Sequence, residues 1–179
     1  MRLTSLLLPL FVASRLTFAA NSVQWVNVTG FWFSPAGGNS THVNAMSEND
    51  CLTKAHSPFA NYNNVTKSCY AIDSCRSFIT DVSSTTAHAK YDPRVFVCYG
   101  NRELNGTVIE RHQEALGFTE CMAKSAAPYD DQGKRNKFNV ITWHGEAKNG
   151  TSVGTCELKA MTSVSKVDRR GVISCKKIF

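Results

Sequence analysis

The side chains here that are able to do acid–base, nucleophilic or metal chemistry are five histidines, seven cysteines and fourteen carboxylates. The histidines are His42, His56, His88, His112 and His144, and none stands at metal-site spacing from another histidine, a cysteine or a carboxylate. A zinc site needs three or four converging ligands. No glycine-rich phosphate loop, Gly-x-Ser-x-Gly turn or His-Glu-x-x-His motif occurs. We therefore expect a non-catalytic protein without a metal or a cofactor.

Residues 1–20 have the features of a cleavable secretion signal. Arg2 supplies a positive start, residues 3–13 are mostly apolar, and Thr17 and Ala19 occupy the −3 and −1 positions of a small-residue cleavage site. The apolar run is too short to span a bilayer. We expect a secreted, extracellular protein with no membrane anchor.

All seven cysteines follow the signal, and in an oxidising compartment this predicts a disulfide framework with one thiol left over. N-glycosylation at exposed positions is predicted by five Asn-x-Ser/Thr sequons, at Asn27, Asn39, Asn64, Asn105 and Asn149.

The charge pattern argues against a nucleic-acid partner. The formal net charge is +6, and loss of Arg2 and Arg15 with the signal leaves 18 basic against 14 acidic residues, or +4. The basic residues are scattered, without a stripe interleaved with aromatics. We expect no nucleic acid to be bound.

A short motif occurs twice, 70 residues apart. Residues 45–55, around Cys51, match residues 115–125, around Cys121, in the order small, aliphatic, acidic, cysteine, aliphatic, lysine, small. Each half then closes on an apolar segment that ends in cysteine, at Cys98 and at Cys175. The repeat predicts two related units, 21–100 and 101–179; if the match is accidental, residues 21–179 form one domain.

Local patterns predict a short helix in each unit. Ser47 is a suitable N-cap, with Asp50 at the capping-box position, for a helix through Cys51 to Ala55, and residues 113–126 match it. Strands are predicted where Val, Ile, Thr, Phe and Tyr are enriched, at 23–33, 68–73, 76–82, 94–99, 106–110, 137–143, 153–160 and 171–178. The expected fold class is α+β and β-rich, with small antiparallel sheets that each carry a short helix and are stapled by disulfides.

The repeat also suggests a disulfide pairing. Cys51 would bond Cys75, and Cys121 would bond Cys156 in the same way, each loop contributing about 3 kcal/mol. Cys98 and Cys175 would join the two units. Cys69 would be left unpaired, either as a buried or heterogeneously paired thiol or as the bridge of a covalent dimer. Connectivity is not deducible from sequence alone.

Two pairs of segments carry a family resemblance. In the first unit they are Asn49-Asp-Cys51-Leu-Thr-Lys and Lys67-Ser-Cys69-Tyr-Ala-Ile; in the second they are Glu120-Cys121-Met-Ala-Lys and Gly154-Thr-Cys156-Glu-Leu. These segments resemble PAN/apple modules. The family's helix carries Cys-x-x-x-Cys, whereas the second of these positions is Ala55 in one unit and Ser125 in the other. The resemblance implies non-enzymatic modules that bind protein or carbohydrate.

Two other resemblances give alternatives. Gly30-Phe-Trp32-Phe33 resembles the Gly-x-Trp opening strand of lipocalins, which implies one all-β barrel around a small apolar ligand. Val140-Ile-Thr-Trp-His144-Gly resembles the histidine-bearing strand of fungal guanyl-specific ribonucleases. That likeness implies His144 as general acid, with Glu110 or Glu114 as base and Arg135 on the phosphate. We favour a plain polar role for His144 at a strand end.

The favoured function is a secreted glycoprotein that binds an extracellular protein or glycan. Aromatic contact candidates are Trp25, Trp32, Tyr62 and Trp143. Since a strand tryptophan is more often core, we expect Trp32 and Trp143 to be buried.

Overall fold

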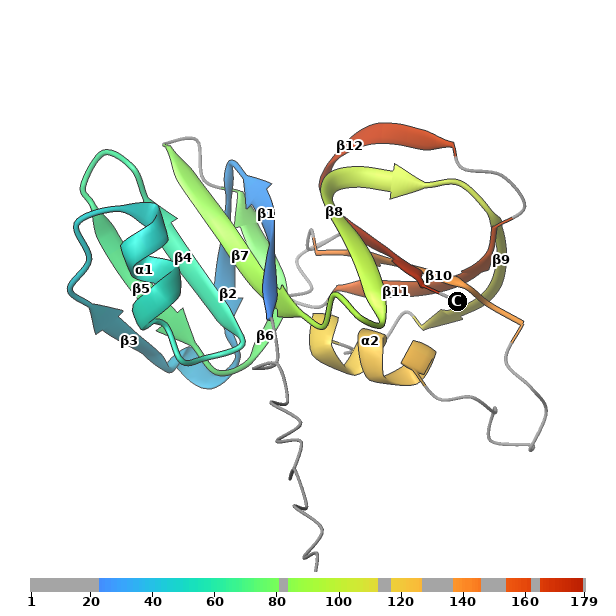
Figure 1. Cartoon of the computed structure of the whole chain (residues 1–179), viewed down its shortest axis with the longest axis horizontal. Coiled ribbons are helices and arrows are strands. Elements are labelled where there is room, and N and C mark those ends of the chain that lie inside the picture. The colour runs from blue at the N-terminus through green and yellow to red at the C-terminus, as the bar shows by residue number, and fades with distance from the viewer. Residues whose placement is uncertain are drawn as a thin grey trace, which may run out of the picture.

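The computed structural model describes residues 23–80, 84–112, 117–126, 137–145, 154–161 and 165–178. Its strands form two five-stranded sheets and one two-stranded ribbon, and every pairing between them is antiparallel (Figure 1). These sheets are open, so the alternative of a single closed barrel of lipocalin type is wrong for the described strands. The chain is β-rich, with two short α-helices and three disulfides.

The first sheet has the strand order β1-β7-β4-β5-β3. Its strands are β1 (Gln24–Thr29), β7 (Thr85–Tyr91), β4 (Phe59–Asn63), β5 (Ser68–Ile72) and β3 (Ser40–Val43). Helix α1 (Glu48–Lys54) comes between β3 and β4 in the chain. A single 3-10 turn, η1 (Ala36–Gly38), precedes β3.

The second sheet has the order β8-β12-β10-β11-β9. Its strands are β8 (Phe96–Leu104), β12 (Lys166–Lys177), β10 (Val140–His144), β11 (Thr155–Ala160) and β9 (Thr107–His112). Helix α2 (Phe118–Ala126) comes between β9 and β10. No helix among the described residues is long and apolar enough to cross a membrane.

Both sheets have one topology. Counted along the chain within its own sheet, the strand order in each is first, fifth, third, fourth, second, and the helix lies between the second and third strands. The 70-residue sequence repeat therefore has a counterpart in the topology. The expected boundary between residues 100 and 101 falls inside β8, which begins at Phe96 in the second sheet.

The ribbon is a two-stranded sheet separate from both five-stranded sheets. It pairs β2 (Phe31–Pro35), which follows β1, with β6 (Cys75–Thr80), which precedes β7. The segment expected as one strand, 23–33, is divided at Gly30, whose φ of 82° is a left-handed conformation that favours glycine. At this turn the chain leaves the first sheet and enters the ribbon.

The ribbon ties the two sheets into one hydrophobic core. Phe33 stacks on Phe78 with 4.8 Å between ring centroids, and Phe78 lies 5.0 Å from Trp143 of the second sheet. The backbone of β6 also forms hydrogen bonds with residues that flank β10 and β11 of the second sheet. Phe78 N donates to Gly145 O, and Gly154 N donates to Arg76 O. The largest cluster of buried side chains accordingly draws on both halves of the chain.

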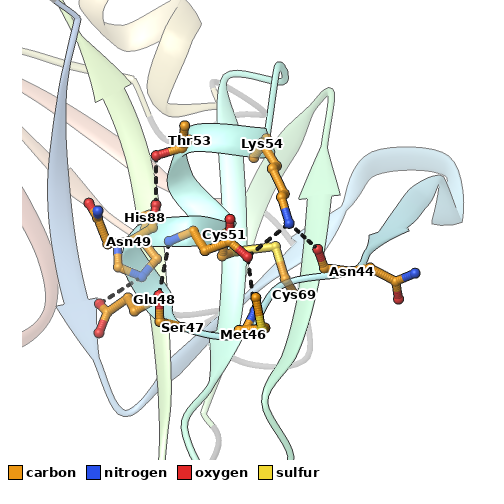
Figure 2. Close-up of a disulfide and its surroundings, with 12 residues drawn as sticks. Asn44, Met46, Ser47, Glu48, Asn49, Cys51, Thr53, Lys54, Cys69 and His88 are labelled. Atoms are coloured by element: carbon orange, nitrogen blue, oxygen red, sulfur yellow. Dashed lines mark hydrogen bonds and ion pairs between the residues drawn. A yellow bond between two sulfur atoms is a disulfide. The ribbon is translucent and has the colours of Figure 1, made fainter.

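Helix α1 begins at the predicted cap (Figure 2). Ser47 Oγ accepts from Asp50 N at 3.2 Å, and the Asp50 carboxylate accepts from Met46 N and from Lys54 Nζ. These bonds satisfy amides at the helix start that have no partner inside the helix. They hold Cys51 on the buried side of α1, where it bonds Cys69 of β5.

The disulfides differ from the predicted set. They are Cys51–Cys69, Cys98–Cys175 and Cys121–Cys156. The expected Cys51–Cys75 bond and the free Cys69 were wrong, because Cys69 lies on β5 beneath α1 whereas Cys75 begins the ribbon strand β6. Cys69 therefore has no free thiol with which to form the intermolecular disulfide of a covalent dimer. Cys98 and Cys175 join neighbouring strands of the second sheet, not the two units.

Cys75 is the free cysteine, and it is buried in the main core. Its Sγ–H donates to Ser77 O at 3.1 Å, and burial raises the pKa of this thiol to about 12. Because thiolate is the reactive form, we predict that a maleimide leaves the folded protein unmodified and labels Cys75 alone after denaturation. Peptide mass spectrometry of the labelled protein, read together with the three disulfide-linked peptides, checks this. Labelling of Cys69 in the folded protein would contradict the assignment.

Loss of the Cys51–Cys69 bond, in the Cys51→Ser/Cys69→Ser variant, is expected to lower the free energy of unfolding by about 3 kcal/mol, since the bond closes a loop of 18 residues. Guanidinium denaturation measures the change. Cys75→Ser is the matched control because it leaves all three disulfides intact. A stability equal to that of the wild-type protein would mean that the bond adds nothing to the packing of α1.

Candidate functional site

Asn61 positions the first candidate site by holding β2 against the first sheet. This β4 side chain is fully buried; its Oδ1 accepts from Phe33 N at 2.8 Å and its Nδ2 donates to Phe33 O at 3.0 Å. The amide thereby satisfies both backbone groups of Phe33, as a neighbouring strand would. Phe33 is fixed with its ring in the core. Because side chains alternate along a strand, the preceding side chain, Trp32, faces the other way.

Trp32 lines an open pocket between the ribbon and the first sheet. The ribbon contributes Trp32 with Ile79 and Thr80, and Trp32 and Ile79 are cross-strand partners. The first sheet contributes Asn63, Ser68 and Tyr70, and the turn between β4 and β5 contributes Thr66. The pocket has a volume of about 580 Å³, which is within the usual range for small-molecule sites.

Two aromatic rings, together with Ile79, form the apolar part of this pocket. Trp32 and Tyr70 lie edge to face with centroids 5.3 Å apart, and His42 of β3 packs on Tyr70 at 5.2 Å. Both pocket rings are half-buried. Held by ring contacts and by strand pairing, they present rigid apolar surface to a ligand at small entropic cost.

Hydroxyl and amide groups form the rest of the lining. Thr66 Oγ1 donates to Ser68 Oγ at 2.9 Å, and Asn63 Oδ1 accepts from the amides of Val65 and Thr66. No lining residue is acidic or basic among those the structure describes. The pocket, which we call the Trp32 pocket, thus suits an uncharged ligand with both apolar and hydroxyl groups.

The equivalent positions of the second sheet hold charges instead. Tyr70 directly follows Cys69, and Glu157 directly follows Cys156, so both side chains face away from the helix that the cysteine binds. Tyr70 is paired with His42, and Glu157 is paired with Arg111. Asn63, at the end of β4, corresponds to His144, at the end of β10.

A bend in β8 and β12 completes this charged cluster. Asn101 has a φ of 53° and Gly171 a φ of 69°, and Gly171 N donates to Asn101 Oδ1. Beyond the bend, Leu104 N reaches Ser174 Oγ, on the face that also carries Glu157. Figure 1 shows both strands curving away from the sheet. The curvature brings the Glu103 carboxylate into contact with the Lys159 ammonium.

Ion pairs satisfy both carboxylates of the cluster. Lys159 Nζ lies 2.6 Å from Glu103 and 3.0 Å from Glu157. Arg111 lies 2.6 Å from Glu157 and Arg169 pairs with Glu103, while His144 Nε2 is 3.3 Å from Glu157. The Lys159 side chain is only 3% exposed, so it needs these partners.

The pKa values of the cluster follow from burial and pairing. Burial raises the pKa of Glu157, but hydrogen bonds and charge from Lys159 and His144 outweigh it and lower that pKa to about 2. Burial raises the pKa of Glu103 too, and Lys159 and Arg169 reverse this into a lowered value. Burial lowers the pKa of His144 more than Glu157 raises it. At neutral pH both carboxylates are ionised and His144 is neutral.

The cluster does not suit a divalent metal. One ligand atom from each of Glu103, His144 and Glu157 lies within 4.8 Å of the others, the geometry of a metal site. The Lys159 ammonium, however, contacts both carboxylates and lies where a metal ion would bind between them. Arg111 and Arg169 add two more positive charges, which repel a cation.

Of the four residues in the ribonuclease-like set, the structure describes His144 and Glu110. His144 has Glu157 beside it, whereas Glu110 pairs with His112 at 2.7 Å. Glu114 and Arg135 lie outside the described residues. The lowered pKa of His144 leaves it without the proton that a general acid donates at neutral pH. The arrangement supports an ion-pair network in preference to that chemistry.

The aromatic candidates occupy different environments. Trp143 and Tyr62 are buried, Trp143 in the main core and Tyr62 under α1. Trp25 is half-buried and packs against the α1 cluster. Trp32, which we expected in the core, lines the pocket.

Four predicted glycosylation positions, Asn27, Asn39, Asn64 and Asn105, are exposed, and Asn149 lies outside the described residues. Asn27 Oδ1 lies 2.8 Å from the Nδ1 atom of buried His88. Attachment of glycan at these positions stays a prediction.

Sequence reasoning missed Tyr70, Glu103, Glu157 and Lys159 as members of a site. One signal was present in Cys156-Glu-Leu-Lys159, where apolar and charged residues alternate strictly. Such alternation is typical of a strand with one buried and one polar face. Tyr70 had no comparable signal, because its partner Trp32 is distant in the chain.

No family model matches this sequence, and a search of curated proteins finds no significant match.

Glu157 is expected to make folding sensitive to acid. Its pKa is lowered from 4.5 to about 2 on folding, so its contribution to stability is complete above pH 4.5 and is lost as the pH falls toward 2. In Glu157→Gln the stability should fall less steeply across that window. Urea unfolding midpoints between pH 2 and 6 measure the slope, with Glu110→Gln, at an exposed pair, as control. An unchanged slope in Glu157→Gln would contradict the assigned pairing.

Proposed function

We propose that this protein is a secreted, non-catalytic saccharide-binding module and that the Trp32 pocket is its binding site. The observation that carries the proposal is the lining: two fixed aromatic rings beside hydroxyl and amide groups, with no charged side chain among the residues described. Of the two expected partner classes, glycan and protein, this lining favours glycan.

The chemistry of sugars matches these groups. A pyranose ring has faces of C–H groups, which pack on aromatic rings, and a rim of hydroxyls, which exchange hydrogen bonds with hydroxyl and amide side chains. Asn63, Thr66, Ser68 and Thr80 supply such groups around Trp32 and Tyr70. A purely apolar ligand would displace water from these polar groups without offering them hydrogen bonds, at a cost in binding energy.

The arrangement of the helices is consistent with a PAN/apple-like pair of modules. The bond Cys51–Cys69 ties α1 to β5, and Cys121–Cys156 ties α2 to β11, at equivalent places in the two halves. A helix stapled to a small antiparallel sheet, once in each unit, is the proposed module. The resemblance that suggested it implies binding without catalysis, in agreement with the proposed role.

Trp32→Ala should reduce saccharide affinity at least tenfold, because it removes the larger ring of the pocket. A glycan array on the secreted protein, before and after enzymatic removal of its own N-glycans, identifies a saccharide, and calorimetry then compares the variants. Trp25→Ala is the matched control, since Trp25 is also half-buried but packs beside α1. Circular dichroism checks that both variants fold.

Ser68→Ala and Thr80→Val give a second measurement that does not disturb the rings. Each removes one hydroxyl from the lining and should weaken binding severalfold. If the protein retains no glycan on the array either before or after enzymatic removal of its own N-glycans, but binds a protein partner with an affinity that is independent of Trp32, the proposal is wrong.

A further inference from the structure

The turn between β4 and β5 carries a glycosylation sequon at the edge of the Trp32 pocket. Asn64, Val65 and Thr66 form the sequon. Asn63 and Thr66, on either side of Asn64, both line the pocket. The Thr66 hydroxyl therefore belongs at once to the sequon and to the pocket wall.

The turn is held in place by several hydrogen bonds. Asn63 Oδ1 accepts from Val65 N and Thr66 N, both at 2.9 Å, and Asn64 N donates to Ser84 O at 2.9 Å. These bonds fix the backbone of Asn64 relative to the first sheet, because Ser84 directly precedes β7. A sugar attached there starts from a defined position beside the pocket.

The side chain of Asn64 is available for attachment. Asn64 is exposed, and its Oδ1 accepts from Lys67 Nζ at 3.0 Å. That bond engages the carbonyl oxygen and not Nδ2, the nitrogen to which an N-glycan is joined.

We propose that Asn64 carries an N-glycan whose first N-acetylglucosamine residues lie in the Trp32 pocket of the same molecule. This inference rests on the proposed saccharide site and names its resident ligand and its regulation. N-acetylglucosamine is uncharged and has C–H faces, hydroxyls and an acetamido group. Those groups match the two rings and the hydroxyl and amide side chains of the lining.

Covalent attachment makes this glycan a strong competitor. A ligand tethered by a short linker has an effective concentration on the order of millimolar. Where the intrinsic Kd of the attached sugars is below this concentration, they fill the pocket most of the time, and the apparent Kd of a free saccharide rises by about the ratio of the two. Absence or removal of the glycan opens the site, so occupancy of Asn64 sets the binding activity of the secreted protein.

Asn105 offers a matched control. It belongs to a sequon, it is exposed, and its amide is bonded to Ser165 beside the second sheet. Asn105 directly follows β8 of the second sheet, whereas the pocket is lined by residues of the ribbon and of the β4–β5 part of the first sheet.

The test compares the wild-type protein, Asn64→Gln and Asn105→Gln, all secreted from glycosylating cells. Peptide mass spectrometry measures occupancy of Asn64. Calorimetry measures binding of N,N′-diacetylchitobiose, which we expect to be at least tenfold tighter for Asn64→Gln than for the other two. In wild type, NMR should show nuclear Overhauser contacts between glycan acetyl methyls and the Trp32 indole, assigned by their loss in Trp32→Ala.

The outcomes separate this inference from the proposed function. An occupied Asn64 with equal affinities and no contact to Trp32 overturns the inference and leaves the saccharide site standing. Contacts to Trp32 in a protein that binds no free saccharide, even as Asn64→Gln, support the inference and overturn the proposed function. An unoccupied Asn64 overturns the inference. If Asn64→Gln fails to fold, enzymatic removal of glycan from native wild-type protein replaces it.

Discussion

The buried amide of Asn61 is the interaction on which the rest of the arrangement depends. By bonding both backbone groups of Phe33, it attaches the ribbon to the face of the first sheet. Two consequences follow from the alternation of side chains along β2. Phe33 enters the core and reaches Phe78 and Trp143, which joins the halves, while Trp32 faces the opposite way and lines the pocket. An apolar residue at 61 would leave the amide and carbonyl of Phe33 buried without partners.

The two halves place different chemistry on one topology. At the face away from the helix, the first sheet presents Tyr70 and Asn63, and the second presents Glu157 and His144 at the equivalent positions. The first set is open and uncharged. The second is closed by the bend of β8 and β12 and neutralised by Lys159, Arg111 and Arg169. The repeated framework therefore carries an open, uncharged aromatic pocket in one half and a salt-bridged, covered face in the other.

Sequence patterns recovered the elements with strong local signals. Ser47 and Asp50 marked the start of α1, and the β-branched and aromatic runs marked β5, β6, β10 and β11. The strands β3, β4 and β7 were missed because Ser, Thr, Ala, Asn and His dominate them, and they owe their conformation to their neighbours in the sheet. The pairing of Cys51 failed for a related reason: Cys69 and Cys75 both follow the helix, and their separation in the chain does not show which of them lies beneath it.

The sequence by itself determined the number of cysteines available for disulfides, the β-rich class and the repeat around Cys51 and Cys121. Those features are local or compositional, so they need no knowledge of which segments meet. Only the tertiary structure decided the disulfide partner of Cys51, the single core shared by both sheets, the Trp32 pocket and the charged cluster around Lys159. Each of these joins residues that are distant in the chain, as Trp32 and Tyr70 are, through strand register and through one buried amide. Local sequence propensity predicts neither the strand register nor the contact that the buried Asn61 amide makes.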